Sequence, residues 1–308
     1  MRFVIAGAGG VGGAIGARLV EAGHDVAWLA RGANGDALRR GLRLQSPLGD
    51  LELGPQKAAE AAGELGPADV VIVAVKMYGL AQLARDLRPL GEACFLPLQN
   101  GIEAHDMLAA ALPGAGVLKG MVSVKSHLAA PGLVVCKSGF CRIRFGGEAH
   151  SERLAAIEAA LNSGKGIRAV VSPHIETDLW RKFVMLTSFS AVSCLARASI
   201  GEVLESPEAY GLLLEAAEEA VAVARAEGVS FKDGAEELVQ SQVRDLPREG
   251  RPSMLEDLEA ARPLELDFLS GAVSRLGRRH GVPTPIHTMA YRALAMRRAG
   301  YNAGPGNR

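Results

Sequence analysis

The chain has 308 residues, of which 48% are hydrophobic and 22% are charged, a composition typical of folded globular proteins rather than disordered ones. The 34 Lys and Arg residues balance the 34 Asp and Glu residues, so the composition gives no support for broad binding to nucleic acid. At ~150 residues per domain, the length predicts two domains.

Short apolar runs alternate with helical patterns in the first part of the chain. Residues 3–6, 26–29 and 70–75 have the length of strands, whereas residues 11–22 and 78–87 have a helical pattern. The run VVIVAV at 70–75 shows no polar alternation, which is typical of a parallel strand buried on both faces. This alternation predicts a doubly wound parallel sheet with helices on its faces.

The segments that follow also favour strands. Residues 95–98 (FLPL) form a further strand, in which Pro97 indicates an edge position or an irregular end. Several β-rich pieces within 116–146 predict an antiparallel extension of the sheet. A helix is expected at 151–163, and a last strand at 168–171.

The pattern changes at Ser172-Pro173, after which helical periodicity dominates. Within 211–226, apolar residues recur at helical spacing and form one stripe. We therefore expect an α/β domain over residues 1–172 and an all-α domain over residues 173–308. Further helices are predicted around 174–195, 233–244, 253–260 and 264–280.

The turn after the first strand carries the strongest motif. It reads GAGGVG, which matches G-x-G-x-x-G between a strand and a helix. The first glycine permits the tight turn, the second lets a pyrophosphate approach the backbone, and the third lets the helix pack on the strand. A glycine-rich turn without a ligand is the alternative. The predicted cofactor-binding residues here are Gly7, Ala8, Gly9, Gly10, Val11 and Gly12.

The end of the second strand indicates which dinucleotide binds. An NAD site places an Asp or Glu there, but this strand is followed by Arg31. A guanidinium suits a 2′-phosphate, so NADPH is the predicted cofactor. Arg31 as a solvated loop residue is the alternative, and Asp36 is a later competitor for the ribose.

Two polar residues follow the next strands. Lys76 comes after VVIVAV, and Asn100 comes after FLPL, where ligands bind in open α/β sheets. Lys76 is expected near cofactor phosphate or ribose, and Asn100 near nicotinamide or substrate. The alternatives are a lysine that leaves a buried strand and an ordinary Asn-Gly turn.

Several motifs together resemble the ketopantoate reductase (2-dehydropantoate 2-reductase) family over nearly the whole chain. They are the glycine motif, AVK at 74–76, LQNG at 98–101, LWRK at 179–182, and SMLED at 253–257 followed by ELD at 265–267. The resemblance implies a Rossmann domain followed by a helical domain similar to that of the 6-phosphogluconate dehydrogenase superfamily. It also implies NADPH-dependent reduction of 2-dehydropantoate to pantoate, on the route to pantothenate and coenzyme A.

The resemblance also assigns roles to residues. It implies that Lys182 is the catalytic proton donor and that Glu265 is the active-site carboxylate near the cofactor. Asn100 and Ser253 would contact the substrate, as would Lys182. The alternatives are structural. Lys182 could lie on a solvated helix face, and Ser253 could form a capping box with a later glutamate. Glu265 and Asp267 could be surface carboxylates paired with Arg262.

The sequence departs from the family at three positions. Members usually carry asparagines that grip the pantoate skeleton, whereas Leu186, Ser190 and Ile200 stand at those places here. A more apolar pocket indicates either a different 2-oxo acid as the substrate or 2-dehydropantoate that binds weakly. A non-catalytic NADP(H)-binding sensor and a β-hydroxyacid or opine-type dehydrogenase are further alternatives.

The remaining features concern location and partners. Four cysteines without a C-x-x-C pair indicate reduced thiols of a cytoplasmic protein. The longest uncharged run after the boundary, residues 183–196, is shorter than the ~20 residues that a membrane span needs. We expect a small-molecule 2-oxo acid as the partner, no nucleic acid, no membrane and no metal, with a homodimer as one alternative for the quaternary state.

Overall fold

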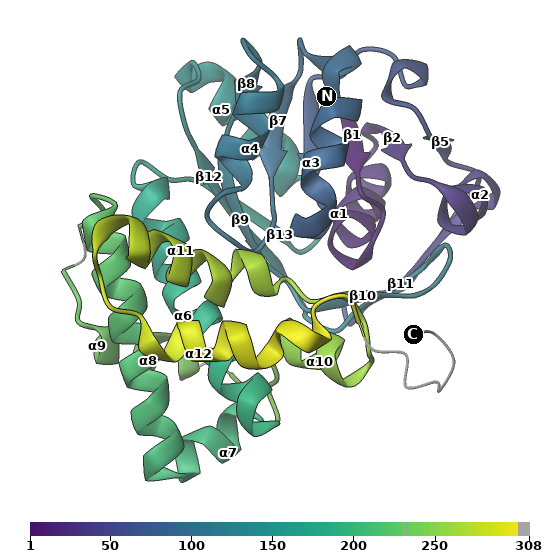
Figure 1. Ribbon diagram of the computed structural model, residues 1–308. Coiled ribbons are helices and arrows are strands. Elements are labelled where there is room, and N and C mark those ends of the chain that lie inside the picture. The colour runs from purple at the N-terminus through teal and green to yellow at the C-terminus, as the bar shows by residue number, and fades with distance from the viewer. Residues whose placement is uncertain (231, 245, 301–308) are drawn as a thin grey trace. The chain divides into compact units, whose positions relative to one another are not determined.

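The structure, a computed structural model, describes residues 1–230, 232–244 and 246–300. The chain forms two compact units, one over Met1–Ile175 and one from Glu176 onward (Figure 1). Within the described residues, none of the helices is both long enough and apolar enough to cross a lipid bilayer.

The first unit is built on a six-stranded sheet in which every pairing is parallel. Strands β1 and β6 lie at its centre and are buried throughout their apolar runs, which explains why VVIV shows no polar alternation. Because β2 and β5 lie on one side of β1 and β6 on the other, the strand order reverses between β1 and β6. In spatial order the strands are β5 (Lys57–Ala59), β2 (Asp25–Leu29), β1 (Arg2–Ala6), β6 (Val70–Val73), β7 (Cys94–Pro97) and β8 (Gly116–Val117).

Pro97 is the last residue of β7, which lies between β6 and β8, so the alternative of an edge position is wrong. Strand β8 pairs with Cys94 and Phe95, and stops before it reaches Pro97. The missing N–H of the proline therefore breaks no hydrogen bond on that side.

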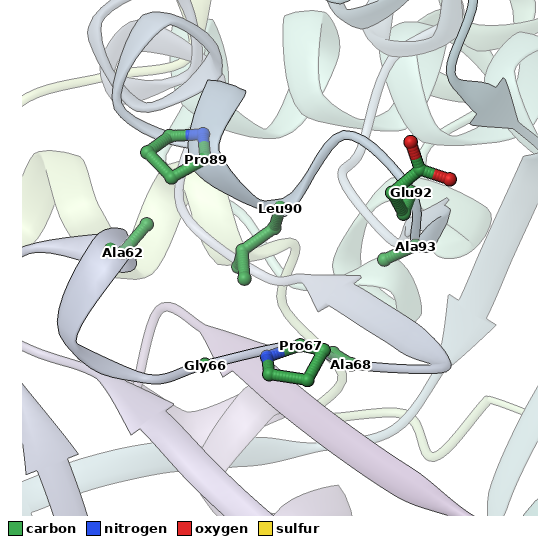
Figure 2. A pocket seen from close by; sticks show the side chains of 9 residues that line it. Ala62, Gly66, Pro67, Ala68, Pro89, Leu90, Glu92 and Ala93 are labelled. Carbon is green, nitrogen blue, oxygen red and sulfur yellow. The ribbon is translucent and has the colours of Figure 1, made fainter.

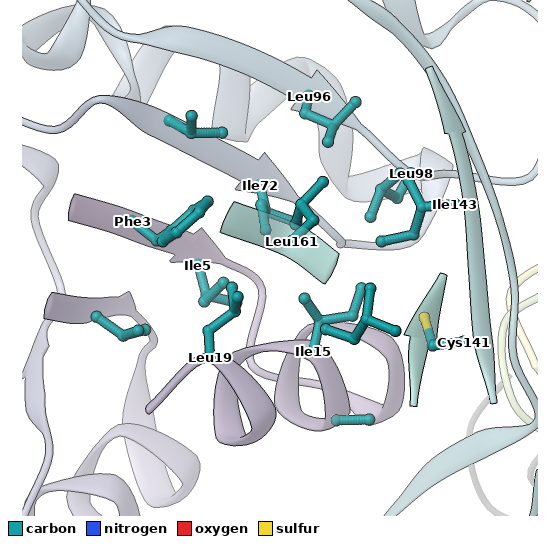
Figure 3. Close-up of a cluster of buried hydrophobic side chains, with 14 of the residues drawn as sticks. Phe3, Ile5, Ile15, Leu19, Ile72, Leu96, Leu98, Cys141, Ile143 and Leu161 are labelled. Atoms are coloured by element: carbon teal, nitrogen blue, oxygen red, sulfur yellow. The ribbon is translucent and has the colours of Figure 1, made fainter. Parts of the chain in front are cut away.

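Helices between the strands complete the α/β unit. Helix α1 (Gly10–Glu21) follows β1, α2 (Gly32–Arg40) follows β2, α3 (Met77–Asp86) follows β6, and α4 (Ala104–Ala111) follows β7. Side chains of β1, α1, β6 and β7 pack into one apolar core, in which Phe3, Ile5, Ile15, Ile72 and Leu96 are fully buried (Figure 3). Short 3₁₀ turns span Ala62–Glu64 and Arg88–Leu90.

Within 116–146 the predicted antiparallel pairing is confirmed, for β10 with β11 and for β9 with β12, but the prediction that these strands extend the main sheet is wrong. Apart from β8, which is parallel, these residues form parts of two separate small sheets. Pairing with distant segments decides this, because β11 pairs in parallel with β3, and β12 pairs in parallel with β13 after the crossover helix α5 (Ser151–Asn162). The first sheet comprises β10 (Ser126–Ala130), β11 (Leu133–Cys136), β3 (Leu42–Gln45) and β4 (Leu51–Leu53), and the second β13 (Ile167–Val171), β12 (Cys141–Gly146) and β9 (Lys119–Ser123).

The second unit is helical throughout its described residues. The amphipathic stripe found in the sequence belongs to α8, and its members Leu213, Ala217 and Ala220 are fully buried. The helices are α6 (Ile175–Ala196), α7 (Ile200–Glu205), α8 (Pro207–Ala226), α9 (Ala235–Val243), α10 (Ser253–Glu259), the 3₁₀ turn η3 (Leu266–Phe268), α11 (Ser270–His280), α12 (Pro285–Leu294) and the 3₁₀ turn Ala295–Arg297.

Candidate functional site

The glycine-rich turn connects β1 to α1, and each motif glycine has a different steric situation. Gly7 adopts φ +108°, and a Cβ there would lie 2.8 Å from the backbone N of Val75. A Cβ at Gly12 would overlap the carbonyl oxygen of Gly7. A Cβ at Gly9 would meet no atom within 4 Å. Gly7 and Gly12 are thus required by the turn itself, while Gly9 leaves open surface of the kind that a pyrophosphate needs for close approach.

The turn is tied to the end of β2 and to the start of α2. The Gly7 N–H donates to the Leu29 carbonyl at 3.3 Å. The side-chain amide of Asn34 donates to the Ala8 carbonyl at 2.7 Å, and its oxygen accepts from the Gly132 N–H at 3.0 Å. These bonds hold the glycine turn and the first turn of α2 in a fixed arrangement, and the sequence did not single out Asn34.

Arg31 lies at the N-cap of α2 and is engaged by protein acceptors. Its Nη2 pairs with Asp86 Oδ2 at 2.8 Å, and its Nε donates to the Glu60 carbonyl at 3.4 Å. The Arg31 side chain as a whole is still 56% exposed. The competing residue, Asp36, pairs instead with Arg39 on its own helix at 2.6 Å.

Lys76 and Asn100 lie at the same edge of the sheet as the glycine turn. Lys76 is the N-cap of α3 after β6, and Asn100 follows β7, which pairs in parallel with β6. Both side chains are half-buried. Because β6 also pairs with β1, this edge gathers the two residues near the point where the strand order reverses, the place at which open α/β sheets bind ligands.

In the helical unit, Lys182 lies on α6 and is half-buried. The buried rings of Trp180 and Phe183 flank it in sequence and stack edge to face at 5.5 Å. Burial lowers the pKa of Lys182 to about 8, and the nearby Glu265 carboxylate opposes this change. The amine is thus less hydrated than one on a fully solvated helix face.

Glu265 is buried, with 3% of its surface exposed, immediately before η3. Arg262 pairs with Asp257 at 2.8 Å. Asp267 accepts from the Tyr291 hydroxyl at 2.9 Å. The alternative of a surface pair between Glu265 and Arg262 is therefore wrong. Instead, the buried Glu265 carboxylate interacts electrostatically with the Lys182 amine.

Ser253 is the first residue of α10, and the N-cap position belongs to Pro252. The helix has no side-chain cap, so the alternative of a capping box at Ser253 is wrong. A capping box does form at the start of α7, between Ser199 and Glu202. The half-buried Ser253 hydroxyl is thus not required as a helix cap.

The three positions that depart from the family are apolar or buried. Leu186 is half-buried one turn after Lys182, and Ser190 is fully buried two turns after it. Lys182, Leu186 and Ser190 therefore share one face of α6. Ile200 is buried at the start of α7. The next side chain on the face of α6 that carries Lys182 is therefore the leucine at position 186.

A shallow cavity of about 260 Å³ lies elsewhere, at the amino ends of β6 and β7 (Figure 2). Its lining contains one charged residue, Glu92. Since the polar groups of the site lie at the carboxyl edge of the sheet, this cavity is not part of the candidate site. It is lined by Ala62, Gly63, Gly66, Pro67, Ala68, Pro89, Leu90, Glu92 and Ala93.

The fold and these groups define the class of Rossmann-type oxidoreductases. Family models agree, since residues 3–147 match ketopantoate reductase PanE/ApbA and residues 174–298 match its C-terminal part. The chain belongs to the ketopantoate reductase family, whose enzymes are oxidoreductases that act on CH–OH groups.

Individual relatives align along the whole chain. An uncharacterized oxidoreductase, YkpB of Bacillus subtilis, is 32% identical and covers 96% of this chain and 98% of its own. The 2-dehydropantoate 2-reductase of Halobacterium salinarum is 31% identical, with 93% and 95% covered. The crystal structure of a PanE/ApbA family ketopantoate reductase from Ralstonia eutropha JMP134 superposes with a TM-score of 0.87 at 27% identity, covering 97% and 98%.

The same fold occurs in an enzyme with another substrate. A ternary structure of D-mandelate dehydrogenase with NADH and anilino(oxo)acetate superposes with a TM-score of 0.87, covering 97% of this chain and 98% of its own. The two sequences are 22% identical, so this likeness concerns the fold.

Proposed function

We propose that the protein reduces a 2-oxo acid with NADPH, and that 2-dehydropantoate is the substrate, giving pantoate for pantothenate and coenzyme A synthesis. The observation that carries this proposal is the Lys182 amine, whose pKa is about 8 and which lies in the field of the buried Glu265. Such an amine is protonated at neutral pH and is still able to give up its proton. Four buried thiols support a cytoplasmic location.

The chain's own groups fit the requirements of this reaction. A nicotinamide, when bound, supplies the hydride to the carbonyl carbon. Lys182 donates a proton to the carbonyl oxygen as negative charge develops there, and becomes the neutral amine. Glu265 favours the charged ammonium before the transfer. Asn100 and Ser253 hold the substrate by hydrogen bonds.

The dinucleotide requires a separate set of groups in the first unit. The open surface at Gly9 and the N–H groups at the start of α1 suit the pyrophosphate. Lys76 adds a cation at the same edge of the sheet. The guanidinium of the exposed Arg31 side chain suits a 2′-phosphate, which is why NADPH is the proposed cofactor.

A second candidate substrate is a 2-oxo acid with an apolar side chain. Leu186 favours it, because a leucine one turn from the reacting amine offers contact area and no hydrogen bond to a substrate hydroxyl. The D-mandelate dehydrogenase with the same fold has an aryl ligand of this general kind, anilino(oxo)acetate. The variant Leu186→Asn should raise kcat/KM for 2-dehydropantoate and lower it for apolar 2-oxo acids.

The test follows NADPH absorbance with a panel that contains 2-dehydropantoate, 2-oxoisovalerate and phenylglyoxylate. Lys182→Met should lower kcat by about 100-fold or more and leave the Kd for NADPH unchanged. The control is Lys232→Met, which removes an exposed lysine of the same unit. Unchanged turnover in Lys182→Met would contradict the mechanism, and NADPH binding without turnover of any acid would favour a sensor.

A further inference from the structure

The residue that follows β5, Glu60, lies beside Arg31. This is the end of the proposed dinucleotide site that would receive the adenosine ribose. Strand β5 pairs in parallel with β2, and the Ala30 N–H donates to the Ala59 carbonyl at 3.0 Å. Glu60 directly follows β5, which ends at Ala59. Its backbone carbonyl accepts from Arg31 Nε at 3.4 Å, so the sheet places Glu60 and Arg31 next to each other.

The side chain of Glu60 accepts a hydrogen bond from the first backbone N–H of α2, the helix that follows β2. Its Oε1 accepts from the Gly32 N–H at 3.0 Å, and Gly32 is the first residue of α2. The N–H groups at a helix N-terminus attract anions. Here the protein's own carboxylate occupies such a group, directly beside the guanidinium.

The same place is tied to the glycine turn. Asn34, in the first turn of α2, donates to the Ala8 carbonyl at 2.7 Å. A dinucleotide whose pyrophosphate lies on this turn directs its adenosine ribose toward the end of β2. Arg31, Gly32 and Glu60 therefore surround the position of the ribose 2′ substituent.

We infer that Glu60 is a specificity-determining residue for the dinucleotide and that it disfavours the 2′-phosphate. The carboxylate repels a phosphate dianion at the Gly32 amide, and it accepts a hydrogen bond from a ribose 2′-hydroxyl. Arg31 acts in the opposite direction. The chain therefore binds NADH as well as NADPH, and its preference reflects the balance between Arg31 and Glu60.

Asp86 further reduces the preference for NADPH. It is 23% exposed and holds Arg31 Nη2 at 2.8 Å. With Nε also engaged, two of the three guanidinium nitrogens already have protein acceptors. A 2′-phosphate must share the guanidinium with these acceptors, which reduces the advantage that Arg31 gives to NADPH.

The inference rests on the proposed function, because it concerns the same dinucleotide site, and calorimetric binding tests it without turnover. Dissociation constants for NADP⁺ and NAD⁺, and for the fragments 2′-AMP and 5′-AMP, are measured on the wild type and on Glu60→Gln. The variant keeps an oxygen for the Gly32 N–H and removes the charge. Glu64→Gln is the matched control, since Glu64 is exposed four residues further on.

In Glu60→Gln we expect the ratio of NADP⁺ to NAD⁺ affinity to rise about tenfold, the size expected for one like-charge interaction near a surface. The affinity for 2′-AMP should rise with it, and Glu64→Gln should match the wild type. If the wild type binds both dinucleotides and Glu60→Gln leaves their ratio unchanged, the inference is wrong. If the wild type binds neither dinucleotide, the proposed function is wrong as well. Failure of the inference alone is thus distinguished from failure of the proposed function.

Discussion

At the scale of single residues, the glycine turn separates structural from ligand-binding demands. Gly12 and Gly9 are both part of G-x-G-x-x-G, yet a Cβ would overlap the Gly7 carbonyl at the first and meet open space at the second. The motif alone does not distinguish these two roles. The surrounding atoms do, because one glycine packs against backbone and the other does not.

This difference predicts that an alanine substitution at Gly12 lowers stability, whereas one at Gly9 lowers the affinity for the dinucleotide. Gly12→Ala should destabilise the protein by about 2 kcal/mol or more, because backbone must move to admit the methyl group. Gly9→Ala should leave stability within about 0.5 kcal/mol and weaken NADP⁺ binding. Chemical denaturation and calorimetry measure the two quantities, and a Gly9→Ala protein with normal affinity would contradict a pyrophosphate at this turn.

Lys182 and Glu265 together predict the pH dependence of reduction. The amine must be protonated to donate, and its pKa is about 8, so kcat/KM should be level below that pH and fall tenfold per pH unit above it. Glu265 raises the pKa of Lys182. Glu265→Gln should therefore move the alkaline limb to lower pH.

The profile is measured as kcat/KM for 2-oxo acid reduction between pH 6 and 10, with Lys232→Met as the control. A limb that stays in place in Glu265→Gln would show that another group titrates. An alkaline limb that moves upward would mean that the carboxylate does not stabilise the ammonium.

At the scale of elements, two buried side chains, Glu219 and His287, join α8 to the start of α12 through hydrogen bonds to backbone. Glu219 accepts from the N–H groups of Ile286 and His287 at 2.7 and 3.0 Å, and so acts as a cap for α12 from another helix. The fully buried His287 ring bonds to the Ala216 carbonyl through Nε2 at 3.0 Å, which fixes the neutral tautomer with its proton on Nε2.

Burial lowers the pKa of His287 to about 4 from 6.5, and this predicts acid sensitivity. Between these values the unfolded chain binds a proton that the folded chain does not, so stability falls as pH falls from about 6.5 to about 4. The loss from this residue is about 3 kcal/mol. The comparison is the free energy of unfolding against pH for wild type and His287→Gln, in which this slope should vanish.

Glu219 acts with the opposite sign in the same experiment. Burial raises the pKa of its carboxyl, so the folded chain takes up that proton before the unfolded chain does. The difference between wild type and His287→Gln removes this shared contribution. An identical pH slope in both proteins would contradict a neutral, buried His287.

At the scale of the whole molecule, the two compact units predict separate responses to the dinucleotide. The proposed pyrophosphate and ribose contacts belong to the unit Met1–Ile175. A ligand that binds the folded state at 100 times its Kd adds about 2.7 kcal/mol of stability. NADP⁺ should therefore raise the Tm of the calorimetric transition in which this unit unfolds.

Hydrogen exchange assigns the effect to a part of the chain. We expect added protection in β1, α1 and the start of α2 when NADP⁺ is present, and none of it in Gly9→Ala at the same concentration. Protection confined to residues from Glu176 onward would place the dinucleotide elsewhere.

Long, strongly periodic elements could be predicted from the sequence. The central strands, α1, α3 and the stripe of α8 match their predicted ranges to within a few residues, because their burial imposes a pattern on neighbouring residues. Short elements such as α2, β3 and β5 were missed. They contain few apolar positions, and their pairing partners lie far away in the sequence.

The sequence by itself determined the α/β-then-helical order and the glycine turn, since local spacing carries that information, and its resemblance to a known family made Lys182 and Glu265 candidates. Tertiary structure alone decided which groups meet: Glu60 at the Gly32 amide, Asp86 on Arg31, and burial around the Lys182 amine. The reason is physical. Charge, desolvation and hydrogen bonding depend on distances through space, and residues 28 or 55 positions apart become neighbours when strands pair and helices pack.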